Sequence, residues 1–377
     1  MANATVGGPE VLTLLRGAVA AGLAPGLVAV AAREGQGGLV WCAGGASYGG
    51  PSVAPDLRYD LASLTKPLAT TTLLLLARRD GLAPETPLGE VLSELAGSPW
   101  SDVTLLQCAT HTAGFPRWEP LYALGGTSRE GYLGALVRLT PIGRPGGRVE
   151  YACPGFIALG LALERSGGSD LATLFAELVA EPLGVADELS YVPGRDVASA
   201  AGEREWYVEQ ALLRERRLAG EPPPRLSGVL SCDDGNARGL GGAAGNAGLF
   251  GTAAAVARLA AEYLPGGGEL VTSEEAGLAT RSHTRGLEQE RGVGWQLAAS
   301  AGCSAGPALS PGAFGHTGFA GTSVWVDPVD RTVFVLLANR LHPGGRTPDL
   351  HPLRRRFHRL AAGTLQRRDA NAGADAP

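Results

Sequence analysis

Segments with the pattern of β-strands lie near both ends of this 377-residue chain, and helical patterns fill the stretch between them. Two short apolar runs near the N-terminus, at 26–33 and 38–43, are joined by a glycine-rich turn. Four more runs lie toward the C-terminus, at 292–298, 313–319, 321–327 and 331–338. Because strands have to pair in a sheet, this order predicts a mixed α/β fold. Its sheet combines N- and C-terminal segments, and a helical domain is inserted between them.

Helical periodicity covers most of the remaining chain. We expect helices at 10–22, 63–79, 103–110, 129–139, 155–166, 169–182, 252–264 and 349–366. Residues 194–245 are polar and rich in glycine and proline, which predicts a long, flap-like excursion. We therefore expect one catalytic domain at 1–369, with a sheet subdomain at 1–60 and 246–369, a helical subdomain at 61–245 and a disordered tail at 370–377.

The net charge of −5 gives no reason to expect nucleic acid or an anionic membrane as a partner. The basic run at 354–356 lies on the expected C-terminal helix and indicates a solvent-exposed face. The N-terminus has no basic region, and the apolar stretch at 11–32 is interrupted by arginine, glycine and proline. Neither a signal peptide nor a membrane span is therefore predicted, and we expect a cytoplasmic location.

The cysteines are five in number and widely scattered, and no Cys-x-x-Cys motif occurs. This arrangement suggests neither a disulfide framework nor a zinc site. The residues concerned are Cys42, Cys108, Cys153, Cys232 and Cys303.

Ser47 lies in a Gly-x-Ser-x-Gly stretch at 45–49, the pattern of the nucleophile elbow of α/β-hydrolases. That motif works only at a sharp turn from a strand into a helix. The residues that follow, 50–55, include two prolines and cannot open a helix at once. We expect Ser47 not to be catalytic.

Ser63 and Lys66 form a Ser-x-x-Lys motif where the extended stretch 57–61 meets an apolar helical run. Ser63 would lie at the helix start, where free backbone N–H groups favour negative charge. Lys66 projects from the same face three residues later. A desolvated lysine in such a site can lose its proton and then accept one from serine. The alternative is that Ser63 only caps the helix and that Lys66 is a surface charge.

Lys66 is the single lysine among the 32 lysines and arginines of the chain. Together with 56 glycines, this resembles a coding bias that converts most lysines into arginines. A lysine kept against such a bias suggests a role that arginine cannot fill.

Two further segments supply partners for this serine and lysine. Tyr151 lies just ahead of an expected helix, and Pro154 suits the first position of that helix. The glycine-rich stretch 315–322 leads into the strand expected at 321–327. Its small residues allow a substrate backbone to lie against the strand edge.

The three motifs together resemble those of the serine β-lactamases, the penicillin-binding proteins and related esterases, namely Ser-x-x-Lys, Tyr-x-Asn and Lys-Thr-Gly (often His-Thr-Gly). The likeness is strongest to the class C and esterase branch and covers most of residues 10–362. It implies an α+β fold of the β-lactamase/transpeptidase type, with a central antiparallel sheet flanked by helices.

The resemblance also implies a mechanism. Ser63 attacks a carbonyl carbon, and Lys66 with Tyr151 takes up its proton. The backbone N–H groups of Ser63 and Phe319 form the oxyanion hole. Substrate-binding positions are His316, Thr317, Gly318 and Cys153, and neither a metal nor a cofactor is needed.

Two positions depart from the family pattern. Cys153 stands where Tyr-x-Asn has its asparagine, and a thiol is a poor substitute for an amide. His316 replaces the lysine of Lys-Thr-Gly, and a mostly neutral imidazole attracts a carboxylate less strongly. We therefore expect a carboxylesterase that acts on a small ester or amide. The alternatives are a β-lactamase or D-amino-acid peptidase and, third, a non-catalytic binding module.

Overall fold

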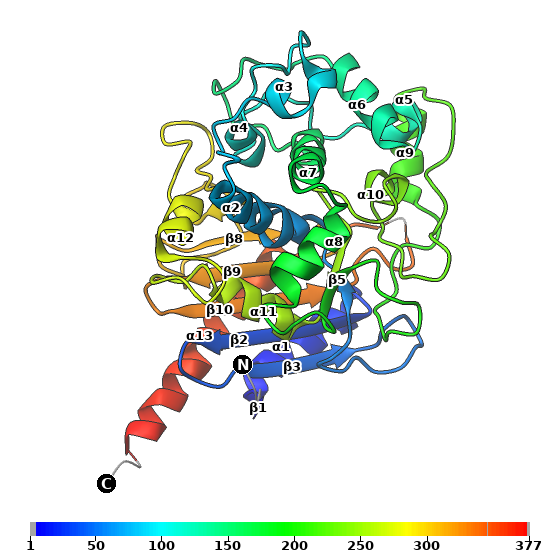
Figure 1. The fold of residues 1–377 in the computed structure, drawn as a ribbon. Coiled ribbons are helices and arrows are strands. Elements are labelled where there is room, and N and C mark those ends of the chain that lie inside the picture. The colour runs from blue at the N-terminus through cyan, green and yellow to red at the C-terminus, as the bar shows by residue number, and fades with distance from the viewer. Residues whose placement is uncertain (1–4, 345, 375–377) are drawn as a thin grey trace.

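The computed structural model describes residues 5–344 and 346–374 and shows an α+β fold around a seven-stranded sheet (Figure 1). Neighbouring strands are antiparallel except for the first pair, β1 and β3, which is parallel. The strand order is β1 (Thr5–Val6), β3 (Leu39–Gly44), β2 (Gly26–Arg33), β10 (Thr332–Ala338), β9 (Ser323–Asp327), β8 (Phe314–Thr317) and β7 (Gln296–Leu297). The prediction that both ends of the chain build one sheet is confirmed.

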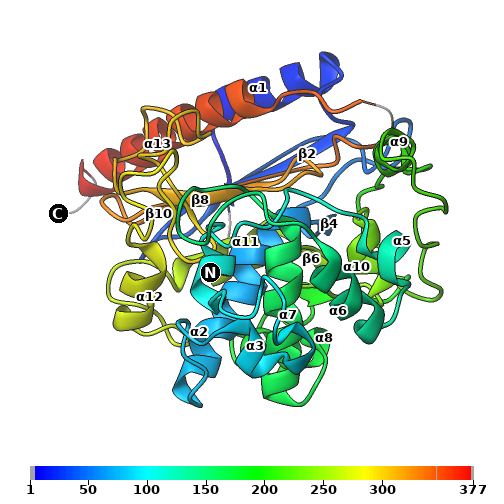
Figure 2. The same cartoon turned by 90° about the horizontal axis from the view of Figure 1, so that it is seen from above.

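The centre of this sheet is the antiparallel pair β2 and β10, in which Val30 lies opposite Val335. Both strands are buried on both faces, so apolar residues occupy nearly every position. Two helices cover one face, α1 (Pro9–Ala20) and α13 (His351–Ala374), while α11 (Ala253–Ala261) and the helical region cover the other (Figure 2). Alternate side chains of β2 and β10 therefore enter two separate cores.

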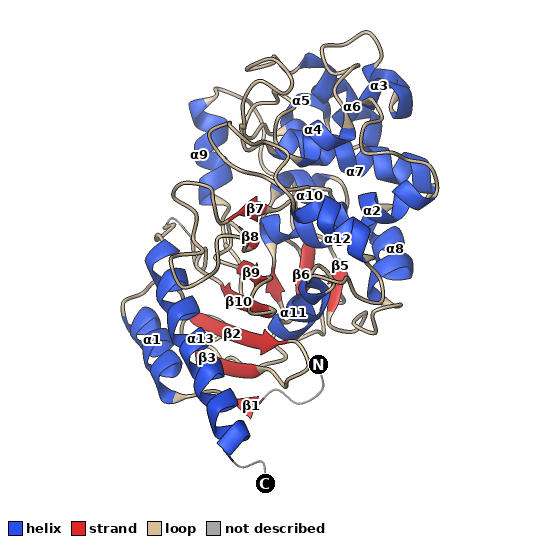
Figure 3. Cartoon of the chain, turned by 90° about the vertical axis from the view of Figure 1, so that its left-hand side faces the viewer, coloured by secondary structure: helices blue, strands red, loops and turns tan. Residues whose placement is uncertain are grey.

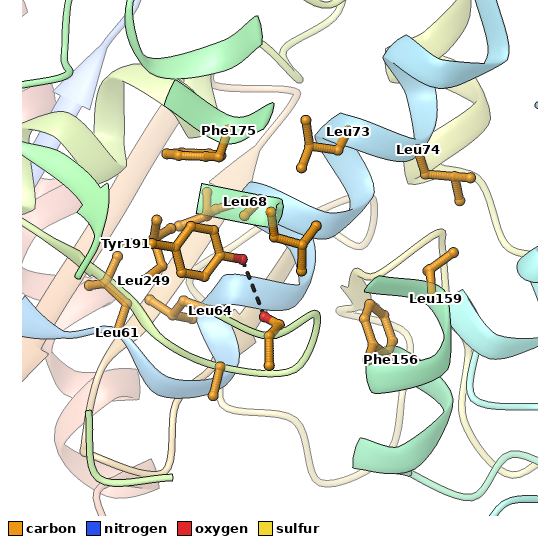
Figure 4. Close-up of a cluster of buried hydrophobic side chains, with 14 of the residues drawn as sticks. Leu61, Leu64, Leu68, Leu73, Leu74, Phe156, Leu159, Phe175, Tyr191 and Leu249 are labelled. Carbon is orange, nitrogen blue, oxygen red and sulfur yellow. Dashed lines mark hydrogen bonds between the residues drawn. The ribbon is translucent and has the colours of Figure 1, made fainter. Parts of the chain in front are cut away.

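The helical region contains short helices packed around one long buried helix, α7. Figure 4 shows Phe156 and Leu159 of α7 near Leu73 and Leu74, which follow the Ser63 segment in the chain. The helices are α2 (Thr72–Arg79), α3 (Leu88–Val91), α4 (Leu105–Ala109), α5 (Leu121–Gly125), α6 (Arg129–Arg138), α7 (Cys153–Gly167), α8 (Leu171–Phe175), α9 (Tyr207–Glu215), α10 (Gly235–Gly239) and α12 (Ser273–Thr280).

A second sheet of three short strands, which the sequence did not predict, lies beside the large one (Figure 3). It joins β4 (Tyr59–Asp60) and β5 (Leu189–Tyr191) to a central strand, β6 (Leu249–Gly251). Strands of two or three residues are too short to show a period-two pattern. This sheet ties the chain just before Ser63 to segments more than 100 residues away.

Four expectations about local structure need correction. The segment 63–79 begins with a 3₁₀ turn, η1 (Ala62–Leu64), and a π-helical turn, η2 (Lys66–Thr71), before α2. The strand expected at 292–298 is only the two residues of β7, because Gly294 has a φ of 75° and turns the backbone just before it. The excursion 194–245 contains α9 and α10.

The fourth correction concerns the C-terminus. Helix α13 continues to Ala374, so residues 370–374 of the expected disordered tail are helical. The rest of that tail, 375–377, lies outside the described residues. Within the part of the chain that the structure describes, no helix combines the length and the apolar character needed to span a membrane.

Candidate active site

Ser63 lies in a tight turn directly after β4. Ala62 has a φ of 47°, a left-handed conformation that residues with side chains rarely adopt. Its N–H donates to Asp60 Oδ1 at 2.8 Å. From the opposite side, the Thr322 hydroxyl donates to the Leu61 carbonyl oxygen at 3.0 Å. The strained turn is therefore fixed by β4 on one side and by the β8–β9 connection on the other.

Lys66 begins the π-helical turn and is completely buried. Its Nζ donates to Ser63 Oγ and to the Asn246 carbonyl oxygen, both at 3.0 Å, and lies 3.7 Å from Cys153 Sγ. Tyr151 donates its hydroxyl to the same Ser63 Oγ at 2.8 Å. The structure thus brings together the serine, lysine and tyrosine that the motifs predict.

The pKa of Lys66 lies above its ordinary value. Burial acts to lower it, but negative charge on Cys153 and Tyr151, when these groups ionise, raises it by more. Burial alone, the effect expected from the sequence, therefore does not set the direction of the shift, which depends on ionisation of Cys153 and Tyr151.

Tyr151 is held by its neighbours just before α7. The Ala152 N–H donates to His111 Nδ1 at 3.1 Å, and the Glu150 N–H donates to the His111 carbonyl oxygen at 2.9 Å. The His111 ring packs against the Tyr151 ring with centroids 4.5 Å apart. His111 therefore organises the loop that carries Tyr151.

The connection between β8 and β9 carries Phe319, whose backbone N–H has no acceptor within the described residues. Arg340 Nε donates to the Phe319 carbonyl oxygen at 2.8 Å. Arg354 Nη2 donates to the carbonyl oxygens of Gly321 and Thr322. Arg354 is 2% exposed, so the expectation that the basic run at 354–356 forms a solvent-exposed face is wrong at this position. Its guanidinium instead holds the turn that presents the Phe319 N–H.

A cavity of about 280 Å³ opens over Ser63. Tyr151 and Cys153 line it next to Ser63, and much of the remaining lining is apolar. The apolar side chains include Trp118, Val208, Leu212, Phe319 and Leu341. Val208 and Leu212 belong to α9, so the excursion 194–245 forms part of the cavity.

Five carboxylates line the same cavity, and we call them the acidic wall. Three of them are linked through backbone donors, since Asp60 Oδ2 accepts the Asp233 N–H and Asp233 accepts the Glu203 N–H. Behind the wall, Arg238 pairs with Glu209 at 3.2 Å and Arg225 with Asp233 at 3.7 Å. The acidic wall consists of Asp60, Glu203, Glu209, Asp233 and Asp234.

Burial, followed by repulsion from neighbouring carboxylates, raises the pKa of Asp60 to about 7 and that of Glu209 to about 8. Burial likewise raises the pKa of Asp233 to about 6. The wall therefore holds protons near neutral pH that isolated carboxylic acids would have released.

A family model described as Beta-lactamase matches residues 13–358. The chain belongs to the Beta-lactamase family. Its membership, with the motifs above, makes it a serine hydrolase.

One named relative and two solved structures illustrate what the chain is similar to. A protein of Escherichia coli (strain K12) named "Putative D-alanyl-D-alanine carboxypeptidase" is 26% identical over 322 residues, which is 78% of this chain and 71% of that protein. The solved structure of "EstCE1, a hydrolase with promiscuous acyltransferase activity" matches with a TM-score of 0.71 and 21% identity, covering 93% of this chain and 97% of the other. A family VIII carboxylesterase matches with a TM-score of 0.68 and 23% identity, covering 95% and 98%. At these identities, the two structures establish the fold alone.

The His-Thr-Gly segment of this Beta-lactamase family member lies beside the reacting groups but does not line the cavity. His316 is 3% exposed, and burial with the charges of Arg291 and Lys66 holds its pKa well below the usual range. It is therefore neutral at pH 7, as expected. A Cβ on Gly318 would lie 2.6 Å from the Leu61 carbonyl oxygen, so only glycine permits this close approach. Direct substrate binding by His316, Thr317 and Gly318 stays a prediction.

Cys153 lines the cavity, and its direct contact with substrate stays a prediction. Burial raises the pKa of its thiol, and the nearby Lys66 only partly opposes this. Cys153 is thus held as a neutral thiol at pH 7, which agrees with the expected packing role rather than with a reactive thiolate.

No pattern in the sequence points to the acidic wall, to the Asn246 carbonyl that binds Lys66 or to the buried Arg291 near Tyr151. Their partners lie far away in sequence, so no local pattern identifies them. Within the described residues, no group of three or more His, Cys, Asp or Glu is arranged to hold a metal ion.

The acidic wall predicts how stability depends on pH. Asp60 and Glu209 keep protons in the folded chain that the unfolded chain loses near its ordinary pKa values of about 4. Because the folded state then binds more protons, the free energy of unfolding should fall as the pH rises from about 6.5 to about 8.5. The buried histidines have lowered pKa values, among them His358 at about 4, so they destabilise mainly below this window. Urea unfolding at constant ionic strength measures the trend, and a rise in stability across the window contradicts it.

Proposed function

We propose that the chain is a carboxylesterase that cleaves small esters through an acyl-enzyme on Ser63. The observation that carries this proposal is the position of Ser63 Oγ, which lies 3.0 Å from Lys66 Nζ and 2.8 Å from the Tyr151 hydroxyl and faces a cavity of about 280 Å³. The charged groups of that cavity are mostly carboxylates. Such a cavity suits an uncharged substrate better than an anionic one.

In the first half-reaction, Ser63 Oγ forms a bond to the ester carbonyl carbon, and its proton passes to Tyr151 in the phenolate form. Lys66 remains an ammonium group, in keeping with its raised pKa, and stabilises that phenolate. The carbonyl oxygen becomes an oxyanion facing the N–H groups of Ser63 and Phe319. As the tetrahedral intermediate collapses, the bond to the alcohol breaks and Tyr151 returns the proton to the leaving alkoxide.

In the second half-reaction, a water molecule gives a proton to Tyr151 and attacks the acyl carbon. The bond from that carbon to Ser63 Oγ then breaks, and Tyr151 protonates Ser63 again. The products are a carboxylic acid and an alcohol, and the enzyme returns to its starting state.

The second candidate function is a D-alanyl-D-alanine carboxypeptidase or β-lactamase, which the name of the Escherichia coli relative favours. Its substrates carry a carboxylate near the scissile bond. Here that carboxylate would enter a cavity with an acidic wall, beside a neutral His316. Cys153 offers no amide to the substrate. These features favour the esterase over the peptidase.

Short-chain p-nitrophenyl esters should therefore be hydrolysed with a kcat/KM on the order of 10²-fold above that for a chromogenic cephalosporin or a D-alanyl-D-alanine peptide. This is the effect of losing two polar contacts at about 1.4 kcal/mol each. Initial rates with the three substrate classes, corrected with the Ser63→Ala variant, measure the ratio.

Efficient turnover of the cephalosporin or the peptide with negligible ester turnover would refute the esterase proposal in favour of the second candidate. Saturable binding of all three substrates without turnover would instead indicate a binding module.

A further inference from the structure

Arg291 is a buried cation without a counter-ion. It lies in the loop between α12 and β7 and is 5% exposed. Its Nη2 donates to the neutral Gln289 side chain, and its Nε is buried without an acceptor. No carboxylate of the described residues lies within ion-pair distance of it. An uncompensated buried charge is strongly destabilising, so an arginine here calls for a functional reason.

The backbone of Arg291 is fixed, so the position of the side chain is not accidental. Its N–H donates to Thr284 Oγ1 at 2.8 Å, and its carbonyl oxygen accepts the His283 N–H at 2.8 Å. The guanidinium carbon lies 5.9 Å from the centroid of the Tyr151 ring. Burial lowers the pKa of Arg291 to about 10, while Tyr151 acts in the opposite direction.

The other groups that face Tyr151 supply only one more positive charge. Lys66 Nζ lies 5.0 Å from the ring centroid. His111 and His316 contact the ring at centroid distances of 4.5 Å and 5.9 Å, and both are held neutral at pH 7. Cys153 is a neutral thiol two residues along the chain, and Glu150 beside Tyr151 is neutralised by Arg117 and Arg148.

We propose that Arg291 is a positioning residue whose charge, held over the Tyr151 ring, stabilises the phenolate form of Tyr151. The inference rests on the proposed function, because it assigns the proton transfer to Tyr151. Tyr151 lines the cavity and Arg291 does not, so a phenolate is the anion that can reach this cation without entering from solvent.

The test compares Arg291→Met, which keeps length but removes charge, with Arg291→Lys, which keeps a charge. Arg58→Met is the matched control, since Arg58 is also buried but contacts Ser190 far along the chain from Tyr151. For each protein, the rate of Ser63 labelling by a fluorophosphonate and the kcat and KM for a p-nitrophenyl ester are measured from about pH 5 to about pH 9.

In Arg291→Met, we expect the acidic limb to move up by about one pH unit in both the labelling profile and the ester-hydrolysis profile. Labelling at about pH 6 should then be roughly tenfold slower than in the wild type. At high pH the rates of the variant and the wild type should converge. Arg291→Lys should restore most of the shift, and Arg58→Met should show none. A uniform loss of rate at every pH would reduce Arg291 to a structural role. If instead the KM for anionic esters rises and the acidic limb of the pH profile does not shift, Arg291 is a substrate-binding residue.

The two proposals fail in different ways, because labelling requires no substrate. Normal labelling without hydrolysis of any ester refutes the esterase proposal alone. If Arg291→Met hydrolyses the ester normally and the acidic limb of its pH profile does not shift, only the proposed role of Arg291 is refuted. A wild-type chain that is not labelled at Ser63 at any pH overturns both.

Discussion

Replacing Ser63 with alanine should lower kcat for a p-nitrophenyl ester by on the order of 10⁴- to 10⁶-fold, as loss of the nucleophile does in other serine hydrolases. The reason is that Ser63 Oγ is the atom on which both Lys66 and Tyr151 converge. Removing one partly exposed hydroxyl should leave the fold intact, which circular dichroism checks.

The matched control is Ser47→Ala, which should keep wild-type activity. Ser47 lies in a turn after β3, where its carbonyl oxygen accepts the Gly50 N–H, and no helix follows it. Intact-mass analysis after fluorophosphonate treatment should give a single adduct, located at Ser63 by peptide mapping. An adduct at Ser47, or wild-type rates in Ser63→Ala, would overturn the assignment of the nucleophile.

The Lys66→Arg variant should lose on the order of 10²-fold in kcat, the cost of displacing a group of the reacting geometry by about 1 Å. Lys66 Nζ occupies a fully buried point between Ser63 Oγ and the Asn246 carbonyl oxygen. A planar guanidinium cannot place its charge at that point and make both contacts. Steady-state kinetics with a short ester measure the loss.

Lys66→Met provides the comparison, because it removes the charge and keeps the length. Thermal melting of both variants separates lost chemistry from a disrupted site. A folded Lys66→Arg protein that retains most of its kcat would show that only a positive charge is needed at this position. The same result would contradict the idea that the single lysine of the chain was kept for its amine.

The parts of the fold that the sequence predicts are those with a long local pattern. Strands β2 and β10 show it because six consecutive apolar residues in each strand are buried on both faces. Ser63, Lys66 and Tyr151, which the structure brings together, could be predicted because each lies in a short motif next to a helix start.

The parts that the sequence did not predict depend on contacts between distant segments. The direction of the Lys66 pKa shift depends on Cys153 and Tyr151, which lie more than 80 residues away. The acidic wall combines Asp60 with carboxylates beyond residue 200, and Arg291 lies 140 positions from Tyr151. No local pattern contains such pairs, so only the folded arrangement reveals them.

The pairing of β2 with β10 also affects the order in which the chain can fold as it is made. Residues 26–33 leave the ribosome early, but the strand that covers their inner edge, 332–338, is among the last to be synthesised. Until then, an apolar strand edge stays open to pairing with other nascent chains. Cells that make this protein must therefore keep a long, partly built intermediate from aggregating. A premature stop codon anywhere before β10 leaves that edge open for good, however complete the residues around Ser63 are.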